Sequence, residues 1–189
     1  MQKISRHKKI VNFKPSRKLD SKPHPSNKKI QKVLKKNNLG IKLDVGCGGA
    51  KQKGFVGLDL RALPGVDIVH NAEIVPYPLP AESCSTILCS HLLEHICPKN
   101  FINVINEFWR LLKPGGQLWI SMPYGTSQGF HQDPTHCGAR NEVTWEYFNP
   151  YHPLYGIYRP KPWIISRNAF YQNGNMEVIM EKMREEDVK

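Results

Sequence analysis

The spacing of apolar residues along the chain predicts one well-defined helix. Between Pro98 and Gly115, large apolar side chains recur every three or four residues, namely Phe101, Val104, Ile105, Phe108, Leu111 and Leu112. This period places them on one face of an α-helix, while the polar residues between them face away. Gly115 is expected to end the helix, because glycine accepts the left-handed backbone of a helix C-terminus.

Short runs rich in Val, Ile and Leu predict five strands. They lie at residues 41–45, 55–60, 66–69, 86–90 and 117–122. Because helical or turn segments separate them, we expect parallel β-α-β units in an open, Rossmann-like α/β sheet with helices on both faces. The crossover after the first strand has only about nine residues, so its helix is expected to shrink to about one turn.

The C-terminal part breaks this alternation and predicts an antiparallel β-hairpin. Two apolar-rich runs, 163–171 and 176–183, flank the dipeptide Asn173-Gly174. This dipeptide is typical of a two-residue hairpin turn, whose central residues both need positive φ. The hairpin is therefore expected to close the sheet.

The charge divides the chain into a basic arm and a nearly neutral body. Residues 1–40 hold 13 Lys and Arg and one acid, a charge of +12, whereas the remainder holds 14 Lys and Arg and 15 acids, a charge of −1. Residues 1–25 contain few large apolar groups, so we predict a flexible arm there and a single domain over 26–189. A short helix is expected to open that domain, with Ile30, Val33 and Leu34 on one face.

The composition disfavours several classes of protein. No run approaches the about 20 apolar residues that a membrane-spanning helix needs, and the N-terminus is too charged for a secretory signal, so a cytoplasmic protein is expected. The five cysteines are an odd number without a C-x-x-C pair, which is typical of reduced thiols rather than of disulfides or a zinc ribbon. These features leave the oligomeric state open.

Glycines and an acid at the ends of the first two predicted strands indicate a nucleoside site. Gly46 and Gly48 follow the first strand, where bare backbone lets a ligand approach closely. Asp59 ends the second strand 13 residues after Gly46, and a carboxylate suits the two hydroxyls of a ribose because it only accepts hydrogen bonds. In nicotinamide-binding folds the acid lies about 20 residues beyond the glycines, which disfavours an oxidoreductase.

Four segments together resemble the successive signature segments of class I S-adenosylmethionine-dependent methyltransferases. They are LDVGCG (43–48), VGLD (56–59), SHLLEHI (90–96) and LKPGGQL (112–118). Their order and spacing resemble that family from about Lys42 to Pro123. The short first crossover and the later segment HQDPTH also resemble a group of small bacterial and phage methyltransferases of the type 11 kind, a resemblance that does not define the acceptor.

The resemblance implies S-adenosylmethionine as the cofactor and gives roles to the residues of the glycine loop. Gly46, Cys47 and Gly48 would border the methionine and ribose parts of the cofactor. Asp44 would approach its amino end, and Asp59 would hold the ribose hydroxyls.

The resemblance also gives roles to residues that follow the third and fourth predicted strands. Asn71, Ala72 and Glu73 would contact the adenine. Ser90 and His91 would face the sulfonium or the incoming acceptor.

The most distinctive segment outside these signatures is HQDPTH, residues 131–136. It lies in a Gly-rich loop, 124–140, which is expected to be an unstructured lid over the carboxyl edge of the sheet. His131 or His136 would take a proton from the acceptor, with Asp133 orienting the imidazole. The same groups also suit a phosphate beside Arg140 or a divalent cation held by the two histidines and Asp133, and a purely structural role in capping a turn is a further alternative.

Two other patterns have mainly structural interpretations. His91 and His95 stand four residues apart, which suits a pair of metal ligands on a helix, but capping or packing is the expected role and no metal ion is assigned. Aromatic residues are dense after the loop, at Trp145, Tyr147, Phe148, Tyr151, Tyr155, Tyr158 and Trp163. We expect them to pack in the core and hairpin, the alternative being a face that stacks on a planar substrate such as a nucleobase.

The sequence thus predicts direct transfer of a methyl group from S-adenosylmethionine to an N, O or C atom of an unidentified acceptor. One alternative is a nucleic-acid-binding protein with a vestigial methyltransferase fold, and another is a nicotinamide-dependent oxidoreductase. The chain has no Asn-Pro-Pro-Tyr or Asp-Pro-Pro-Tyr segment and no Pro-Cys pair, which lowers the expectation of a DNA acceptor.

The basic arm indicates attraction to polyanions such as nucleic acid or an anionic membrane surface, the alternative being a solvated tail that only aids solubility, and binding of nucleic acid would depend on salt. Lysine and arginine that neutralise phosphates release counterions, so the affinity falls steeply as salt rises. In a fluorescence-anisotropy titration, the full chain is expected to bind RNA or DNA with such salt dependence, and a variant without residues 1–25 is expected to bind more weakly, because the deletion removes eight Lys and Arg. Unchanged binding after this deletion would place the contact on the rest of the chain instead.

Overall fold

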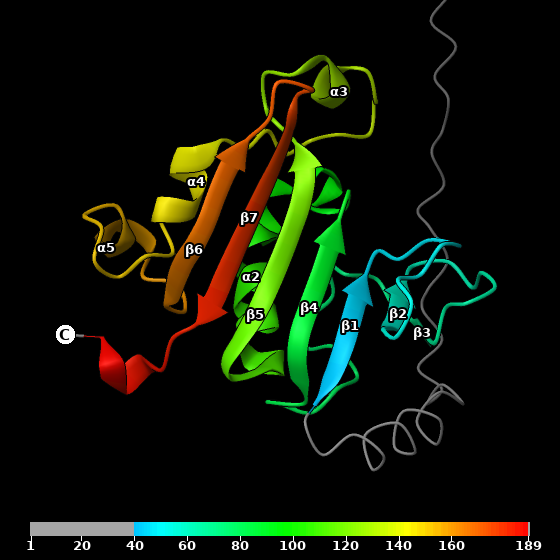
Figure 1. The fold of residues 1–189 in the computed structure, drawn as a ribbon, viewed down its shortest axis with the longest axis horizontal. Helices are drawn as coiled ribbons and strands as arrows, with labels where there is room; N and C mark the ends of the chain where they lie inside the picture. Colours follow the sequence, from blue (N-terminus) through cyan, green and yellow to red (C-terminus); the bar gives the residue numbers. More distant parts are fainter. Residues whose placement is uncertain (1–39, 189) are drawn as a thin grey trace, which may run out of the picture.

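The computed structural model describes residues 40–188 and arranges them in one open seven-stranded sheet (Figure 1). The strand order is β3-β2-β1-β4-β5-β7-β6. Strands β1 to β5 pair in parallel, and β7 pairs antiparallel with both β5 and β6. The predicted fold class is therefore confirmed, while the predicted arm and the helix expected before Gly40 lie outside the described residues.

All five strands predicted for the parallel part are present, with small shifts at their ends. The elements are β1 (Ile41–Val45), β2 (Val56–Asp59), β3 (Ile68–Val69), β4 (Cys84–Ser90), η1 (Leu93–His95), α2 (Pro98–Leu111), β5 (Leu112–Pro123), α3 (Gln128–His131), α4 (Glu142–Glu146), α5 (Tyr155–Tyr158), β6 (Trp163–Phe170), β7 (Asn175–Lys182) and η2 (Glu185–Asp187). Within the described range, every helix is too short or too polar to cross a membrane.

Helix α2 builds the core with the central strands. Pro98 occupies its first turn, where the missing N–H of proline leaves no hydrogen bond unmade. The predicted apolar stripe is buried, and Phe108 is fully enclosed. It packs in one cluster with Leu118, Ile120 and Met122, which alternate along β5 on the face toward the helix.

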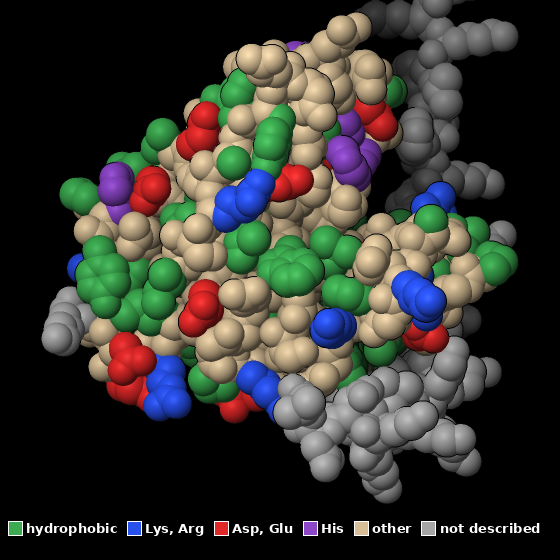
Figure 2. Space-filling view, in the orientation of Figure 1, with side chains coloured by type: hydrophobic (Ala, Val, Ile, Leu, Met, Phe, Trp, Pro, Cys, Tyr) green, Lys and Arg blue, Asp and Glu red, His purple; other side chains and the backbone are tan. Residues whose placement is uncertain are grey.

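The opposite face of the sheet carries exposed apolar side chains. Trp119 points away from Leu118 and Ile120, because side chains alternate along a strand, and it is 40% exposed. Figure 2 views this face and shows hydrophobic side chains near its centre. In Figure 1, α2 and α4 lie behind the sheet, and α2 is the one described helix of several turns. Among the described residues the helices thus cover mainly one face, whereas helices were expected on both.

The end of α2 differs from the prediction. The helix ends at Leu111, and Leu112 already has an extended backbone that begins β5. Gly115 does take a left-handed backbone, with φ of +71°, but it lies in an irregular stretch where the pairing of β5 with β4 skips from Leu112 to Gln117. The glycine therefore serves a strand bulge rather than a helix terminus.

The hairpin is confirmed, but its turn differs from the expected one. The N–H of Gly174 donates to the carbonyl of Tyr171 (2.9 Å), and the N–H of Tyr171 donates to the carbonyl of Asn175 (2.8 Å). Three residues, 172–174, thus form the loop, and among them Gly174 alone has positive φ, at +84°. A type I turn followed by one left-handed glycine explains this loop. The prediction of a positive φ at both Asn173 and Gly174 is therefore wrong.

The loop at residues 124–140 is more ordered than predicted. It contains the short helix α3, where the Ser127 hydroxyl accepts a hydrogen bond from the N–H of Phe130 (3.2 Å). In Figure 1 this loop lies beyond the carboxyl ends of β4 and β5, as expected. The expectation of an unstructured segment is wrong, because Ser127 supplies a helix cap that satisfies a free N–H.

The packing around α2 predicts a large loss of stability on truncation of Phe108. Its ring is fully buried and meets Tyr77 edge to face at 6.1 Å between centroids. Phe108→Ala is expected to lower the free energy of unfolding by about 3–5 kcal/mol in urea denaturation. Ile157→Ala, at an exposed position of α5, is the control and should change it by less than about 0.5 kcal/mol; equal losses would contradict the proposed core.

Candidate active site

Two left-handed glycines fix the turn that follows β1. Gly46 has φ of +74° and Gly48 has φ of +54°. The N–H groups of Gly46 and Cys47 both donate to the carbonyl of Leu58, at 2.8 and 3.2 Å, which ties the turn to β2. A Cβ at Gly46 would lie 3.0 Å from the Cβ of Leu92, so a side chain there would be both strained and crowded.

The crossover from β1 to β2 consists of turns instead of a full helix, as predicted. The N–H of Ala50 donates to the carbonyl of Cys47 (3.3 Å), and the N–H of Phe55 donates to the carbonyl of Gln52 (3.1 Å). The turns press on the next strand, because a Cβ at Gly57 would lie 2.7 Å from the Cys47 sulfur. The glycine in β2 is therefore needed for this close approach.

Asp59 joins the end of β2 to the glycine turn. Its Oδ2 accepts a hydrogen bond from the N–H of Gly48 (2.8 Å), and its Oδ1 accepts one from the N–H of Arg61 (2.9 Å). Burial raises the pKa of Asp59, but these bonds and the Arg61 guanidinium together hold the pKa below its usual value. Asp59 is thus a carboxylate at physiological pH.

This carboxylate retains capacity for further hydrogen bonds. A carboxylate offers about four lone-pair sites, of which two hold backbone N–H groups. A third accepts from Nε of Arg61 (3.3 Å), whose side chain is largely exposed and free to move aside. When Arg61 moves aside, two sites remain unoccupied, and this number matches the two hydroxyls of a ribose.

Asp44 and Cys47 form the inner wall of the turn. Burial raises the pKa of Asp44, whose Oδ2 accepts a hydrogen bond from the N–H of Gln52 (2.8 Å). Burial also raises the pKa of the Cys47 thiol to about 11, and the charges of Asp44 and Asp59 add to this effect. Cys47 is therefore a neutral thiol at physiological pH and not a nucleophile.

A cavity of about 230 Å³ opens beside the glycine turn. It brings together five of the residues predicted to touch the cofactor: Gly46, Asp59, Asn71, Ala72 and Glu73. Five other residues that were predicted to contact the cofactor are described but do not line this cavity: Asp44, Cys47, Gly48, Ser90 and His91. Because pockets for whole drug-sized ligands measure about 300–1,000 Å³, this cavity suits the nucleoside part of a larger cofactor.

The side chains of Asn71 and Glu73 fix the wall of this cavity. Oδ1 of Asn71 accepts a hydrogen bond from the N–H of Glu73 (2.9 Å). Oε1 of Glu73 accepts hydrogen bonds from the N–H of Cys97 (2.6 Å) and from Nδ2 of Asn100 (3.4 Å), at the start of α2. Glu73 thus acts as a cap for this helix, a role that its position after β3 does not reveal.

The end of β4 presents His91 in an unusual backbone conformation. Its φ is +51°, and its N–H donates to the carbonyl of Ser121 in β5 (2.8 Å). Nδ1 of His91 lies 3.3 Å from Oε1 of Glu94, and this carboxylate raises the pKa of His91 against the opposing effect of burial. Positive φ at a residue other than glycine often marks functional sites, because the strain must be held by the surroundings.

The loop at residues 124–140 docks on η1 and brings His136 to Glu94. The N–H groups of Cys137 and Gly138 donate to the carbonyl of Glu94, at 2.9 and 3.0 Å. Nε2 of His136 then lies 4.0 Å from Oε1 of Glu94 and 3.8 Å from Oδ2 of Asp133. Two of the three predicted catalytic residues, Asp133 and His136, are therefore close together.

The third predicted catalytic residue, His131, stands apart from this pair. It is exposed, and its ring packs edge to face on Phe130 at 5.3 Å between centroids. Asp133 accepts two hydrogen bonds from Thr135, which lower the pKa of the Asp133 carboxyl and close a local turn. The structural role that the sequence left open for Asp133 and Thr135 is thus also present.

Sequence reasoning missed Glu94 as a member of the site. Glu94 is fully buried, and the neighbouring residue His95 lines the cavity beside the glycine turn. The available signal was the position of Glu94, beside His95 and three residues after His91, since a carboxylate so close to two histidines can pair with them.

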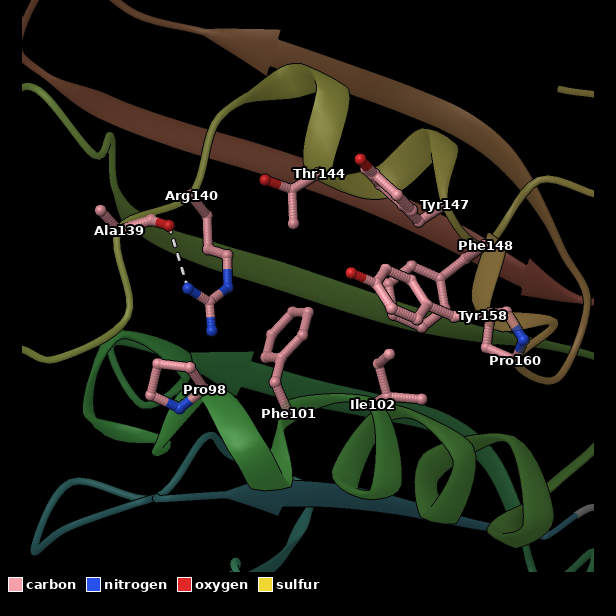
Figure 3. A pocket seen from close by; sticks show the side chains of 10 residues that line it. All are labelled: Pro98, Phe101, Ile102, Ala139, Arg140, Thr144, Tyr147, Phe148, Tyr158 and Pro160. Carbon is pink, nitrogen blue, oxygen red and sulfur yellow. Dashed lines mark hydrogen bonds between the residues drawn. The ribbon is translucent and has the colours of Figure 1, made fainter. Parts of the chain in front are cut away.

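A second cavity of about 400 Å³ lies between α2 and the segment from α4 to Pro160 (Figure 3). Arg140 stacks over the ring of Phe101, with its Cζ 4.1 Å from the centroid, and burial lowers the pKa of Arg140. Tyr147 and Tyr158 also line this cavity, with ring centroids 5.6 Å apart.

The aromatic residues of the C-terminal region have different surroundings. Trp145, Phe148 and Trp163 are buried in the core, as expected, whereas Tyr151 is exposed and the hydroxyl of Tyr155 donates to the carbonyl of Pro160 (2.9 Å). Tyr147 and Tyr158 line the cavity, and their stacking on a planar substrate stays a prediction.

The central part of this chain matches a known protein family. Residues 43–120 match the family described as a methyltransferase domain. The ubiquinone biosynthesis O-methyltransferase of Pseudomonas entomophila (strain L48) is 32% identical over an alignment that covers 42% of this chain and 42% of that protein. The match thus spans less than half the length of this curated relative.

Comparison with solved structures supports the fold over a larger part of the chain. A SAM-dependent methyltransferase from Archaeoglobus fulgidus has a TM-score of 0.54 and 16% identity, over 82% of this chain and 92% of that one. The [4+2]-cyclase SpnF has a TM-score of 0.55 and 15% identity, over 82% of this chain and 80% of that one. At these identities the likeness concerns the fold, and the cyclase shows that one fold hosts different activities.

Proposed function

We propose that this chain, whose residues 43–120 match a methyltransferase-domain family, transfers a methyl group from S-adenosylmethionine to an N, O or C atom of an acceptor. The observation that carries the proposal is the hydrogen bond between Gly48 and Asp59. It sets an ionised carboxylate and bare backbone at the edge of one cavity of nucleoside size. When bound, S-adenosylmethionine supplies a methyl group on a positively charged sulfur.

The residues of the cavity fit the nucleoside part of this cofactor. Asp59 would accept hydrogen bonds from the ribose hydroxyls, and Asn71 and Ala72 would border the adenine. Gly46 leaves room for the ligand because it carries no side chain. Asp44, Ser90 and His91, which follow or end the strands on either side, would meet the methionine end at the switch point between β1 and β4.

His136 and Asp133 are proposed to handle the proton of the acceptor. Their side chains lie 3.8 Å apart on the loop that covers the carboxyl ends of β4 and β5. Holding two reactants in an attack geometry supplies about 7–11 kcal/mol, and a general base adds a factor of about 10²–10⁴. Orientation is therefore the larger contribution, with His136 favoured over the exposed His131.

The second cavity is proposed to hold the distal part of the acceptor. Arg140 belongs both to this cavity and to the loop that carries His136. Its guanidinium and the rings of Tyr147 and Tyr158 suit a planar group with a negative charge. Nucleic acid bound by the basic arm and a cytoplasmic location remain predictions, and the family match gives no support to an oxidoreductase.

Substitutions at Asp59 and His136 separate cofactor binding from turnover. Asp59→Ala is expected to weaken the binding of S-adenosylhomocysteine by about 10–100-fold, because it removes hydrogen bonds to a charged group. The affinity is measured by calorimetry. His136→Ala should retain that affinity and lower methyl transfer by about 100-fold or more. Transfer is measured with labelled S-adenosylmethionine on fractionated RNA, DNA, protein and metabolites.

The control for both substitutions is Asp187→Ala, in the exposed η2 turn. It should leave both the affinity and the transfer unchanged. Cofactor binding that is lost in His136→Ala but kept in Asp59→Ala would refute the two roles.

A further inference from the structure

Glu94 is a buried acid whose charge has little compensation within the described structure. Its side chain is fully enclosed on η1, and neither carboxylate oxygen has a hydrogen bond from a described residue. The nearest nitrogen is Nδ1 of His91, 3.3 Å from Oε1. Burying a charge without hydrogen bonds costs several kcal/mol, so such a group is either neutralised by a proton or paired with a cation.

Two imidazoles beside Glu94 are held with their Nε2 atoms free to bind. Nδ1 of His136 lies 2.8 Å from the carbonyl of Phe130, and because a carbonyl only accepts, this nitrogen carries the proton. Nε2 of His136 therefore has a lone pair, and it lies 4.0 Å from Oε1 of Glu94.

His95 is oriented in the same way through a hydroxyl. The hydroxyl of Thr135 donates to Oδ1 of Asp133 (2.7 Å), so its oxygen accepts from Nδ1 of His95 (3.0 Å). This assigns the proton to Nδ1 and leaves Nε2 as an acceptor. The rings of His95 and His136 lie 4.6 Å apart, edge to face.

We propose that Glu94, His95 and His136 bind a divalent transition-metal ion, with Zn²⁺ as the best fit. One ligand atom from each residue lies within 4.8 Å of the other two. Two imidazoles and one carboxylate form a ligand set for zinc that leaves a fourth position open. Bound zinc holds its ligands at about 2.0–2.2 Å, so the three side chains need only move slightly inward.

The surrounding hydrogen bonds match those of metal-binding histidines. Such histidines almost always donate their second ring N–H to a carbonyl, a carboxylate or another acceptor, which fixes the ring. Here Phe130 and Thr135 provide these acceptors. The cluster thus has the ligands, the orientation and the buried negative charge that a cation requires.

The proposed ion also has a function in methyl transfer, and this second step rests on the proposed function. His95 lines the cofactor cavity together with Gly46 and Asp59. An ion at the cluster would therefore lie beside the cofactor and hold an oxygen atom of the acceptor at its open position. With the ion bound, Nε2 of His136 would be a ligand, so the ion would lower the pKa of the acceptor in its place and the proton would leave to solvent; without the ion, His136 takes the proton as proposed above.

Metal titration of the full chain tests the cluster without any need for activity. After treatment with a chelator, the protein is titrated with Zn²⁺ in a calorimeter and with Co²⁺ by visible absorption. We expect one equivalent to bind, with a Co²⁺ spectrum free of the thiolate band that cysteine ligands would give. Glu94→Gln and His136→Asn should each weaken metal binding by about 100-fold or more. This loss exceeds the about 10–100-fold that is typical when a residue that only hydrogen-bonds to a metal ligand is replaced.

Matched variants separate the cluster from other groups. His152→Asn removes a histidine outside the cluster, which accepts from the N–H of Leu154, and should leave metal affinity unchanged. Thr135→Val should weaken binding by about 10-fold, because His95 loses its orienting partner. Retained binding of S-adenosylhomocysteine and a cooperative thermal transition show that each variant is folded.

Two results overturn the inference. One is a wild-type chain that takes up no stoichiometric metal, which would mean that His91 alone compensates Glu94. The other is an affinity that Glu94→Gln and His136→Asn leave unchanged. Metal uptake without methyl transfer would support the metal site and contradict the proposed function. Methyl transfer without metal uptake would support the proposed function and contradict the metal site.

Discussion

The hydrogen bond from the N–H of Gly48 to the carboxylate of Asp59 is the contact on which the candidate site depends. It joins the turn after β1 to the end of β2, so that bare backbone and an ionised acid lie at one cavity. The left-handed backbone at Gly48 and the absent side chain at Gly57 make this approach sterically feasible. A larger residue at Gly57 would push the crossover away from β2 and open the site.

The sequence predicted most of the fold because local patterns agree with the global arrangement. The stripe around Phe108 has a helical period and becomes the buried face of α2. Gly115 shows the limit of such reasoning, since its left-handed backbone occurs in a strand bulge, and a glycine alone does not reveal which element it interrupts. Likewise, Gly174 signals a tight turn, but the pairing of β6 with β7 decides its length.

The site was only partly predictable, because some of its residues are close in sequence and others meet only through the packing of a distant loop. The glycines and Asp59 lie close in sequence at successive strand ends, so the parallel topology alone brings them together. Glu94 and His136 are far apart in sequence and meet because Cys137 and Gly138 hydrogen-bond to the backbone of Glu94. No spacing rule foretells that contact, which explains why the carboxylate beside the histidines was missed.

We propose above all that this pocket binds the ribose of S-adenosylmethionine through Asp59. Its most direct test is a crystal structure of the full chain with S-adenosylhomocysteine. The account predicts both ribose hydroxyls within hydrogen-bonding distance of the Asp59 carboxylate, with Arg61 displaced and the nucleoside against Gly46. A complex in which the ribose lies away from Asp59, or in which side chains fill the cavity, would contradict it.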